Sequence, residues 1–224
     1  MQQTFFIAGT DTGAGKTVLT ALLTRFLRKG GANAAALKPI CSGSRNDARA
    51  LHAATNGALS LNEINPWQFR APIAPLLAAR CERRRVRLAA VLAHVRTMQK
   101  RFDILLIEGA GGLLSPLGEN FNSRDLLTAL LATPIVVCPN RLGAVNQVLL
   151  TLEALPQRFR HQARVVLMST PKPDAAAILN VKLLAEFFDA KRVFTLPWLG
   201  KKCEAARVIR EPAVRRTLRP LIRV

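Results

Sequence analysis

Short, uninterrupted apolar runs alternate along the chain with stretches of helical spacing. Such runs predict strands buried on both faces, because these strands have no polar side to alternate with. The predicted strands cover residues 4–8, 34–37, 104–107, 134–138, 165–168 and 193–196. In the intervening stretches apolar residues recur every three or four positions, which predicts helices. The predicted helices cover residues 18–27, 45–61 with a loop break at Asn56-Gly57, 76–98, 146–155 and 175–188.

This alternation predicts an α/β fold with a mostly parallel sheet and helices on both faces. We see no internal repeat, low-complexity segment or linker, so residues 1–224 are expected to form one domain with a basic tail at about residues 201–224. Sheets of this kind bind ligands beyond the carboxyl ends of their strands. Polar residues that directly follow the apolar runs are therefore the candidate site residues.

A glycine-rich turn, GTDTGAGKT at residues 9–17, joins the first strand to the first helix. The usual phosphate-loop pattern is GxxxxGK[ST]; here its first glycine is missing and Gly9 lies one residue early. Backbone N–H groups and the helix start can still hold phosphates. These features predict a single-domain P-loop fold rather than a chance glycine turn. The predicted nucleotide contacts are Gly13, Ala14, Gly15, Lys16 and Thr17, the last also as a Mg²⁺ ligand.

Polar residues follow two other strands at the same predicted edge. Glu108 comes directly after residues 104–107 and could hold Mg²⁺, although a helix-capping acid is the alternative. Lys38 ends the strand at 34–37, and Asp47 is a second candidate carboxylate for Mg²⁺. We expect Lys38 beside the phosphate loop, because the first two strands of such units are commonly close.

The segment CPNRLGAVNQ follows the strand at 134–138. N–H groups at the start of its helix, near Arg141, form a plausible carboxylate site, and an ordinary strand-to-helix turn is the alternative. The three histidines are isolated, and no Ser-His-Asp or Cys-His arrangement is visible.

Composition narrows the class of protein. Thirty-three Lys and Arg against 14 Asp and Glu give a net charge of +19, which favours polyanion partners. The charge is spread, however, between an arginine cluster at 83–87 and a tail with eight Lys or Arg, and no aromatic residues interleave with it to stack bases. A solvated basic surface is therefore expected, and nucleic-acid binding is not.

The lack of a visible targeting signal and the spacing of the cysteines favour a cytoplasmic location. No apolar run approaches the roughly 20 residues that span a bilayer, and no signal peptide is visible. Four cysteines without CxxC spacing predict free thiols and no zinc site. We expect a cytoplasmic protein without a membrane partner.

Taken in order, these segments resemble dethiobiotin synthetase. The shared stretches are GTDTGAGKT, LKPICSGS, the Asp47 segment, IEGAGGLLSPL, RLGAVNQ and PWLG, between residues 5 and 200. The resemblance implies an ATP-dependent ligase that closes the ureido ring of dethiobiotin from diaminopelargonate and CO₂, through a phosphorylated carbamate. It also implies a homodimer with the active site near the subunit interface.

The resemblance assigns roles to individual residues. Lys16, Lys38 and Thr12 would be catalytic, and Thr17, Asp47 and Glu108 would hold Mg²⁺. Substrate contacts would come from Thr12, Lys38, Ser42 and Gly111, and from Gly143, Ala144, Val145 and Asn146 at a helix start of the partner subunit. The nucleotide base would meet Ser169, Pro197, Trp198 and Leu199.

Two departures from the family pattern concern the nucleotide. Family members often carry, after the fifth strand, an asparagine that reads adenine, where this chain has Met168-Ser169-Thr170. The second departure is the tail after Gly200, which is much more basic than the family pattern; the ribose contact is assigned to Glu204 in this tail.

Three other functions compete with this interpretation. A partition-type ATPase that binds DNA or membrane suits the charge, but Asp11 replaces that class's second lysine. A cobyrinate-type amidoligase would have a glutaminase domain, which is absent here. A non-enzymatic basic binding protein is the third alternative.

Overall fold

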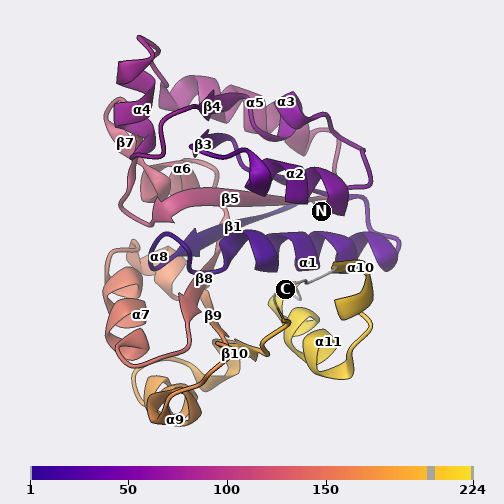
Figure 1. The fold of residues 1–224 in the computed structure, drawn as a ribbon, viewed down its shortest axis with the longest axis vertical. Helices are drawn as coiled ribbons and strands as arrows, with labels where there is room; N and C mark the ends of the chain where they lie inside the picture. Colours follow the sequence, from indigo (N-terminus) through magenta and orange to yellow (C-terminus); the bar gives the residue numbers. More distant parts are fainter. Residues whose placement is uncertain (1, 201–204, 223–224) are drawn as a thin grey trace.

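A six-stranded parallel sheet forms the centre of the protein, with the strand order β10-β9-β8-β1-β5-β2 (Figure 1). The computed structural model describes residues 2–200 and 205–222. The strands are β1 (Gln3–Gly9), β2 (Ala34–Leu37), β5 (Ile104–Gly112), β8 (Thr133–Pro139), β9 (Arg164–Met168) and β10 (Val193–Leu196). All six predicted strands and the α/β fold class are confirmed. The apolar runs form strands because both of their faces are covered: Phe6, Leu106 and Val136 are fully buried.

The order of the strands corrects one sequence expectation. β5 lies between β1 and β2, so the first two strands are not neighbours. Parallel pairing places Leu37 opposite Ile107 and Ile7 opposite Glu108. Lys38 and Glu108 therefore leave the sheet side by side, next to the loop that follows β1.

Helices cover both faces of the sheet. α1 (Lys16–Lys29) packs on β1, β2 and β5, and α10 (Ala205–Val208) and α11 (Pro212–Leu218) pack against α1 (Figure 1). The remaining helices are α2 (Asn46–Ala54), α3 (Leu61–Ile64), α4 (Pro75–Cys81), α5 (Leu88–Gln99), α6 (Ser123–Ala129), α7 (Ala144–Glu153), α8 (Gln157–Arg160) and α9 (Ala175–Leu184). α2 lies beside α1, whereas α5 and α6 pack on β5, and α7 and α8 pack on β8. Parallel crossovers are right-handed, so the connections from β5 to β8 and from β8 to β9 put their helices on the face opposite α1.

The helix predicted over residues 76–98 is wrong as one element. It is α4 and α5, separated where Arg83 takes a left-handed conformation with φ 54°. Residues 82–85 are all charged and could equally lie on the exposed face of one helix, so the sequence pattern does not reveal the break. In contrast, the predicted break at Asn56-Gly57 separates α2 from α3, and both residues have positive φ.

Two small strand pairs were not predicted, because each strand has three residues or fewer. β3 (Ile40–Ser42) pairs in parallel with β4 (Trp67–Phe69), and β6 (Pro116–Gly118) pairs antiparallel with β7 (Phe121–Asn122). β3 begins two residues after Lys38, so the β3–β4 pair lies next to the carboxyl end of β2. Within the described residues, every helix is too short or too polar to span a bilayer.

Candidate active site

The loop after β1 wraps closely around the start of α1. Gly15 is the residue before the helix and has φ 98°, a left-handed conformation that favours glycine. A Cβ atom at Gly15 would also lie 2.9 Å from Cε of Met168. The first N–H groups of α1 have no partner within the helix, and they point into the loop where a phosphate would lie.

Gly9 explains how the loop works without the usual first glycine. A Cβ atom there would lie 2.7 Å from Nζ of Lys16 and 2.8 Å from the carbonyl oxygen of Asp11. Its absence lets Lys16 fold back over the loop, where Nζ donates to the carbonyls of Asp11 (2.9 Å) and Gly111 (2.7 Å). The amine of Lys16 is thus held by neutral acceptors that a phosphate can replace.

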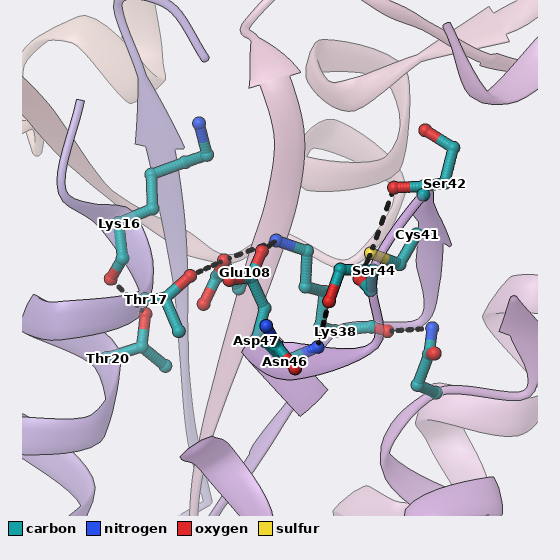
Figure 2. Close-up of polar contacts among 12 residues, drawn as sticks. Lys16, Thr17, Thr20, Lys38, Cys41, Ser42, Ser44, Asn46, Asp47 and Glu108 are labelled. Carbon is teal, nitrogen blue, oxygen red and sulfur yellow. Dashed lines mark hydrogen bonds and ion pairs between the residues drawn. The ribbon is translucent and has the colours of Figure 1, made fainter. Parts of the chain in front are cut away.

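Lys38, Asp47, Glu108 and Thr17 form one polar cluster beside this loop (Figure 2). Oε1 of Glu108 accepts hydrogen bonds from the Thr17 hydroxyl at 2.7 Å and from Nζ of Lys38 at 2.8 Å. Lys38 also forms an ion pair with Asp47. Lys38 and Glu108 are 5% and 1% exposed, so their charges are compensated mainly by each other.

The two lysines have opposite pKa shifts. Burial disfavours the charged form of Lys38, but Glu108 and Asp47 together outweigh it and raise the pKa of Lys38. Burial, and then the charge of Lys38, lowers the pKa of Lys16 to about 8. Lys38 therefore stays positively charged beside its two carboxylate partners. Lys16 forms no ion pair with a carboxylate in the described part of the chain, so its charge is less stabilised.

Asn65 fixes the backbone of Lys38 from a neighbouring turn. Its Nδ2 donates to the Lys38 carbonyl at 2.9 Å, and the Lys38 N–H donates to Ile64 at 3.0 Å. Arg45 in turn donates to the Asn65 carbonyl at 2.9 Å. This role of Asn65 was not predicted, because the residue follows the short helix α3 and belongs to no motif.

The oxygen atoms of the cluster suit a magnesium ion. Oε2 of Glu108 is buried and has no hydrogen-bond partner in the described part of the chain. The Thr17 hydroxyl and the Asp47 carboxylate line the same cavity as Glu108 (Figure 2). Mg²⁺ prefers such hard oxygen ligands and commonly takes one or two carboxylates plus substrate phosphates. No group of three or more His, Cys, Asp or Glu side chains gathers within residues 2–200 and 205–222.

These residues surround a cavity of about 680 Å³. Most of the predicted site residues line it: Thr12, Gly13, Gly15, Lys16, Thr17, Lys38, Ser42, Asp47, Glu108 and Gly111. The structure therefore brings the phosphate loop, the Lys38 segment and the Glu108 segment into one site.

Several further lining residues were missed. The segment 72–75 forms one wall, where the carbonyl of Ile73 accepts a 2.6 Å hydrogen bond from the Ser42 hydroxyl. The Ser115 hydroxyl oxygen accepts a hydrogen bond from the Gly112 N–H at 2.9 Å. Ser115 lies three residues after the GAGG segment and was not predicted as a site residue. Cys41 also lines the cavity; burial raises the pKa of its thiol, so it stays protonated.

The other predicted contacts lie outside this cavity. Gly143, Ala144, Val145 and Asn146 form the start of α7 and do not line it. Ser169 and Pro197 line a separate hollow of about 480 Å³, which Trp198 and Leu199 do not line. Glu204 lies outside the described residues.

Comparisons with known proteins find relatives that match most of the chain. Residues 3–205 match a family model described as an AAA domain. The chain is 39% identical over 209 residues to the ATP-dependent dethiobiotin synthetase BioD of Anaeromyxobacter dehalogenans (strain 2CP-C), covering 91% of this chain and 94% of that protein. It is 35% identical over 187 residues to the Akkermansia muciniphila protein of the same name, covering 83% and 88%.

Solved structures show a related fold at low sequence identity. A ParA family ATPase from Chlorobium tepidum TLS aligns over the whole of both chains with a TM-score of 0.59 and 10% identity. The pNOB8 ParA bound to nonspecific DNA aligns over 99% of both chains with a TM-score of 0.54 and 13% identity. At this identity, the likeness concerns the fold alone.

Replacing Lys38 with methionine should destabilise the protein by about 3 kcal/mol, because it leaves a buried carboxylate unpaired. Adding Glu108→Gln should recover part of that loss, since it removes the unpaired charge. Urea unfolding of both single variants and of the double variant measures the coupling. Additive losses would show that Lys38 and Glu108 do not stabilise each other.

Proposed function

The chain belongs to the family of ATP-dependent dethiobiotin synthetases, and on that premise we propose how its residues act. The proposed reaction converts 7,8-diaminopelargonate, CO₂ and ATP into dethiobiotin, ADP and phosphate, which makes the enzyme a ligase. The observation that carries the proposal is the pair of buried lysines, Lys16 at the start of α1 and Lys38 after β2, which line one cavity.

Anion repulsion is the main barrier that the site must lower. A carbamate formed on one substrate amine is anionic, and it must attack the terminal phosphate of ATP, which is also anionic. Lys38 would bind the carbamate, because Glu108 and Asp47 keep its amine charged. Lys16 would leave the carbonyls of Asp11 and Gly111 and bind the transferring phosphoryl group.

Thr17, Asp47 and Glu108 would hold Mg²⁺, with the unpartnered Oε2 of Glu108 as one ligand. Bound there, the ion would offset negative charge on the phosphates of ATP.

Ring closure follows on the phosphorylated carbamate. The second amine attacks the carbamate carbon and phosphate leaves, so this amine must be held close to that carbon. Thr12 and Ser42 line the cavity and would orient the two nitrogens. The wall at 72–75, tied to Ser42 through Ile73, would limit access of water to the reactive intermediate.

We further propose that two copies of the chain associate through α7 and α9. These helices contact each other (Figure 1). Six large apolar side chains on these helices and next to them are exposed. They are Leu142, Leu150, Ile178, Leu179, Leu183 and Phe187. Gly143 to Asn146 lie at the start of α7, away from the chain's own cavity, and Gly143 and Asn146 are exposed there. In a dimer they could bind the carboxylate of a substrate held by the partner subunit.

The decisive assay incubates the protein with diaminopelargonate, bicarbonate, Mg²⁺ and ATP, and detects dethiobiotin. ATP hydrolysis that is indifferent to the diamine but stimulated by DNA would instead support a partition-type ATPase.

Lys16→Ala and Lys38→Ala should each lower kcat by about a hundredfold or more, because each removes a cation that offsets developing charge. Dethiobiotin formation under saturating substrates is the measurement. The matched control is Lys100→Ala, which removes an exposed lysine outside the cavity. Near-normal turnover in either site variant would refute the role given to that lysine.

Ile178→Glu combined with Phe187→Glu should produce monomers, because it places charge on the α7–α9 surface. Light scattering after gel filtration measures the mass, and dethiobiotin formation should fall in parallel. Leu131→Glu, which charges an exposed leucine outside this surface, is the control. A fully active monomer would show that each chain carries a complete site.

Nucleotide selectivity should be weak, because Met168 lies against Gly15 where a carboxamide would otherwise be available to a base. We expect kcat/KM values for ATP, CTP and GTP within about tenfold of one another, since an apolar contact discriminates weakly. Met168→Asn should increase the preference for ATP. A wild-type preference for ATP above a hundredfold would mean that other groups read the base.

A further inference from the structure

A second cavity, of about 520 Å³, lies at the opposite end of α1 from the phosphate loop. Arg25, Arg28 and Lys29 come from the last turns of α1, and Arg210 comes from the turn after α10. Figure 1 shows α10 beside this end of α1. Because α1 has 14 residues, about 20 Å separates the two cavities.

Among the described residues that line this cavity, four are cations and none carries a negative charge. Its other lining residues are Gly31, Ala32, Asn33, Asn56 and Ile209, and none is acidic. Six arginines elsewhere form ion pairs with carboxylates, for example Arg80 with Glu119 at 3.0 Å. Within the described part of the chain, none of the four cations of this cavity forms an ion pair. The negative end of the α1 dipole, about half a charge, offsets only a small part of four positive charges.

Two of the four cations are held in place. Nη1 of Arg25 donates to Oδ1 of Asn56 at 2.5 Å, and Nη1 of Arg28 donates to the carbonyl of Ala34 at 2.9 Å. Two guanidinium groups that are held in place and line the same cavity form a suitable site for an oxyanion.

An apolar hollow adjoins the cationic cavity. It has a volume of about 410 Å³ and shares Lys29, Ala32, Ile209 and Arg210 with it. Its apolar lining is Phe26, Leu27, Ala32, Ile209 and Ile222. A ligand that fills both spaces has an anionic end and an apolar portion.

We propose that this paired cavity binds a small phosphate ester with an apolar substituent. The phosphate lies between Arg25, Arg28, Lys29 and Arg210, because a dianion with three acceptor oxygens matches four cations better than a single carboxylate does. The apolar substituent lies against Phe26 and Ile222. The site is separate from the ATP site and does not depend on the reaction proposed above.

Calorimetric titration of the full chain, saturated with β,γ-imido-ATP and Mg²⁺, tests the proposal with the phosphate loop blocked. Hexyl phosphate should bind once per chain, at least about tenfold more tightly than pyrophosphate or hexyl glucoside, which each supply one half of the chemistry. No binding of hexyl phosphate at millimolar concentration would overturn the proposal. Displacement of hexyl phosphate by a DNA duplex that binds more tightly would overturn it in favour of a nucleic-acid surface.

Arg25→Gln with Arg28→Gln should weaken hexyl phosphate binding by at least about tenfold. Each substitution removes a hydrogen bond between two charged groups, and such bonds contribute more to the binding free energy than neutral ones. Lys29→Gln with Arg210→Gln, which removes the two exposed cations, should weaken it similarly and covers the case that the first variant misfolds. The charge-matched control is Arg96→Gln with Arg219→Gln, both exposed and outside either cavity. An equal loss in the control would overturn the proposal. Dethiobiotin formation is measured separately, so failure here is distinguishable from failure of the proposed reaction.

Discussion

The buried ion pair between Lys38 and Glu108 is the constraint on which the site depends. The 2.8 Å contact forms because the sheet register sets Leu37 opposite Ile107, one residue before each partner. A buried pair of this kind is stable only when its remaining donors and acceptors are also satisfied. Asp47 and Thr17 supply two of these contacts, and the free Oε2 of Glu108 remains available for a metal ion.

Lys16 differs from Lys38 in that no carboxylate forms an ion pair with it in the described part of the chain. Lys38 is compensated within the protein, whereas Lys16 is buried beside another cation and is held only by carbonyl groups. An anionic ligand supplies the negative charge that the loop lacks, which makes phosphate binding favourable at this position. The glycines at 9 and 15 allow the close approach that brings Lys16 and the helix start together.

The α1 helix connects two sites of positive charge with different protein surroundings. At its first turn, carboxylates from β5 and α2 lie close to the lysines and provide places for a metal ion. At its last turn the described part of the chain provides no carboxylate, so the arginines face an apolar hollow alone. The high net charge therefore does not by itself identify a binding site. Whether a cation can bind an anionic ligand depends on whether a carboxylate of the protein already pairs with it.

The sequence by itself determined the six strands, the phosphate loop, and Lys38, Asp47 and Glu108 as candidates, because each signal is local. A buried strand needs a continuous apolar run, and a phosphate loop needs glycines before a helix. Only the tertiary structure decided that β5 separates β1 from β2 and that Asn65 holds the Lys38 backbone. It also decided that the residues at 72–75 and Ser115 complete the cavity. These features are contacts between segments distant in the chain, and no local spacing encodes which segments meet.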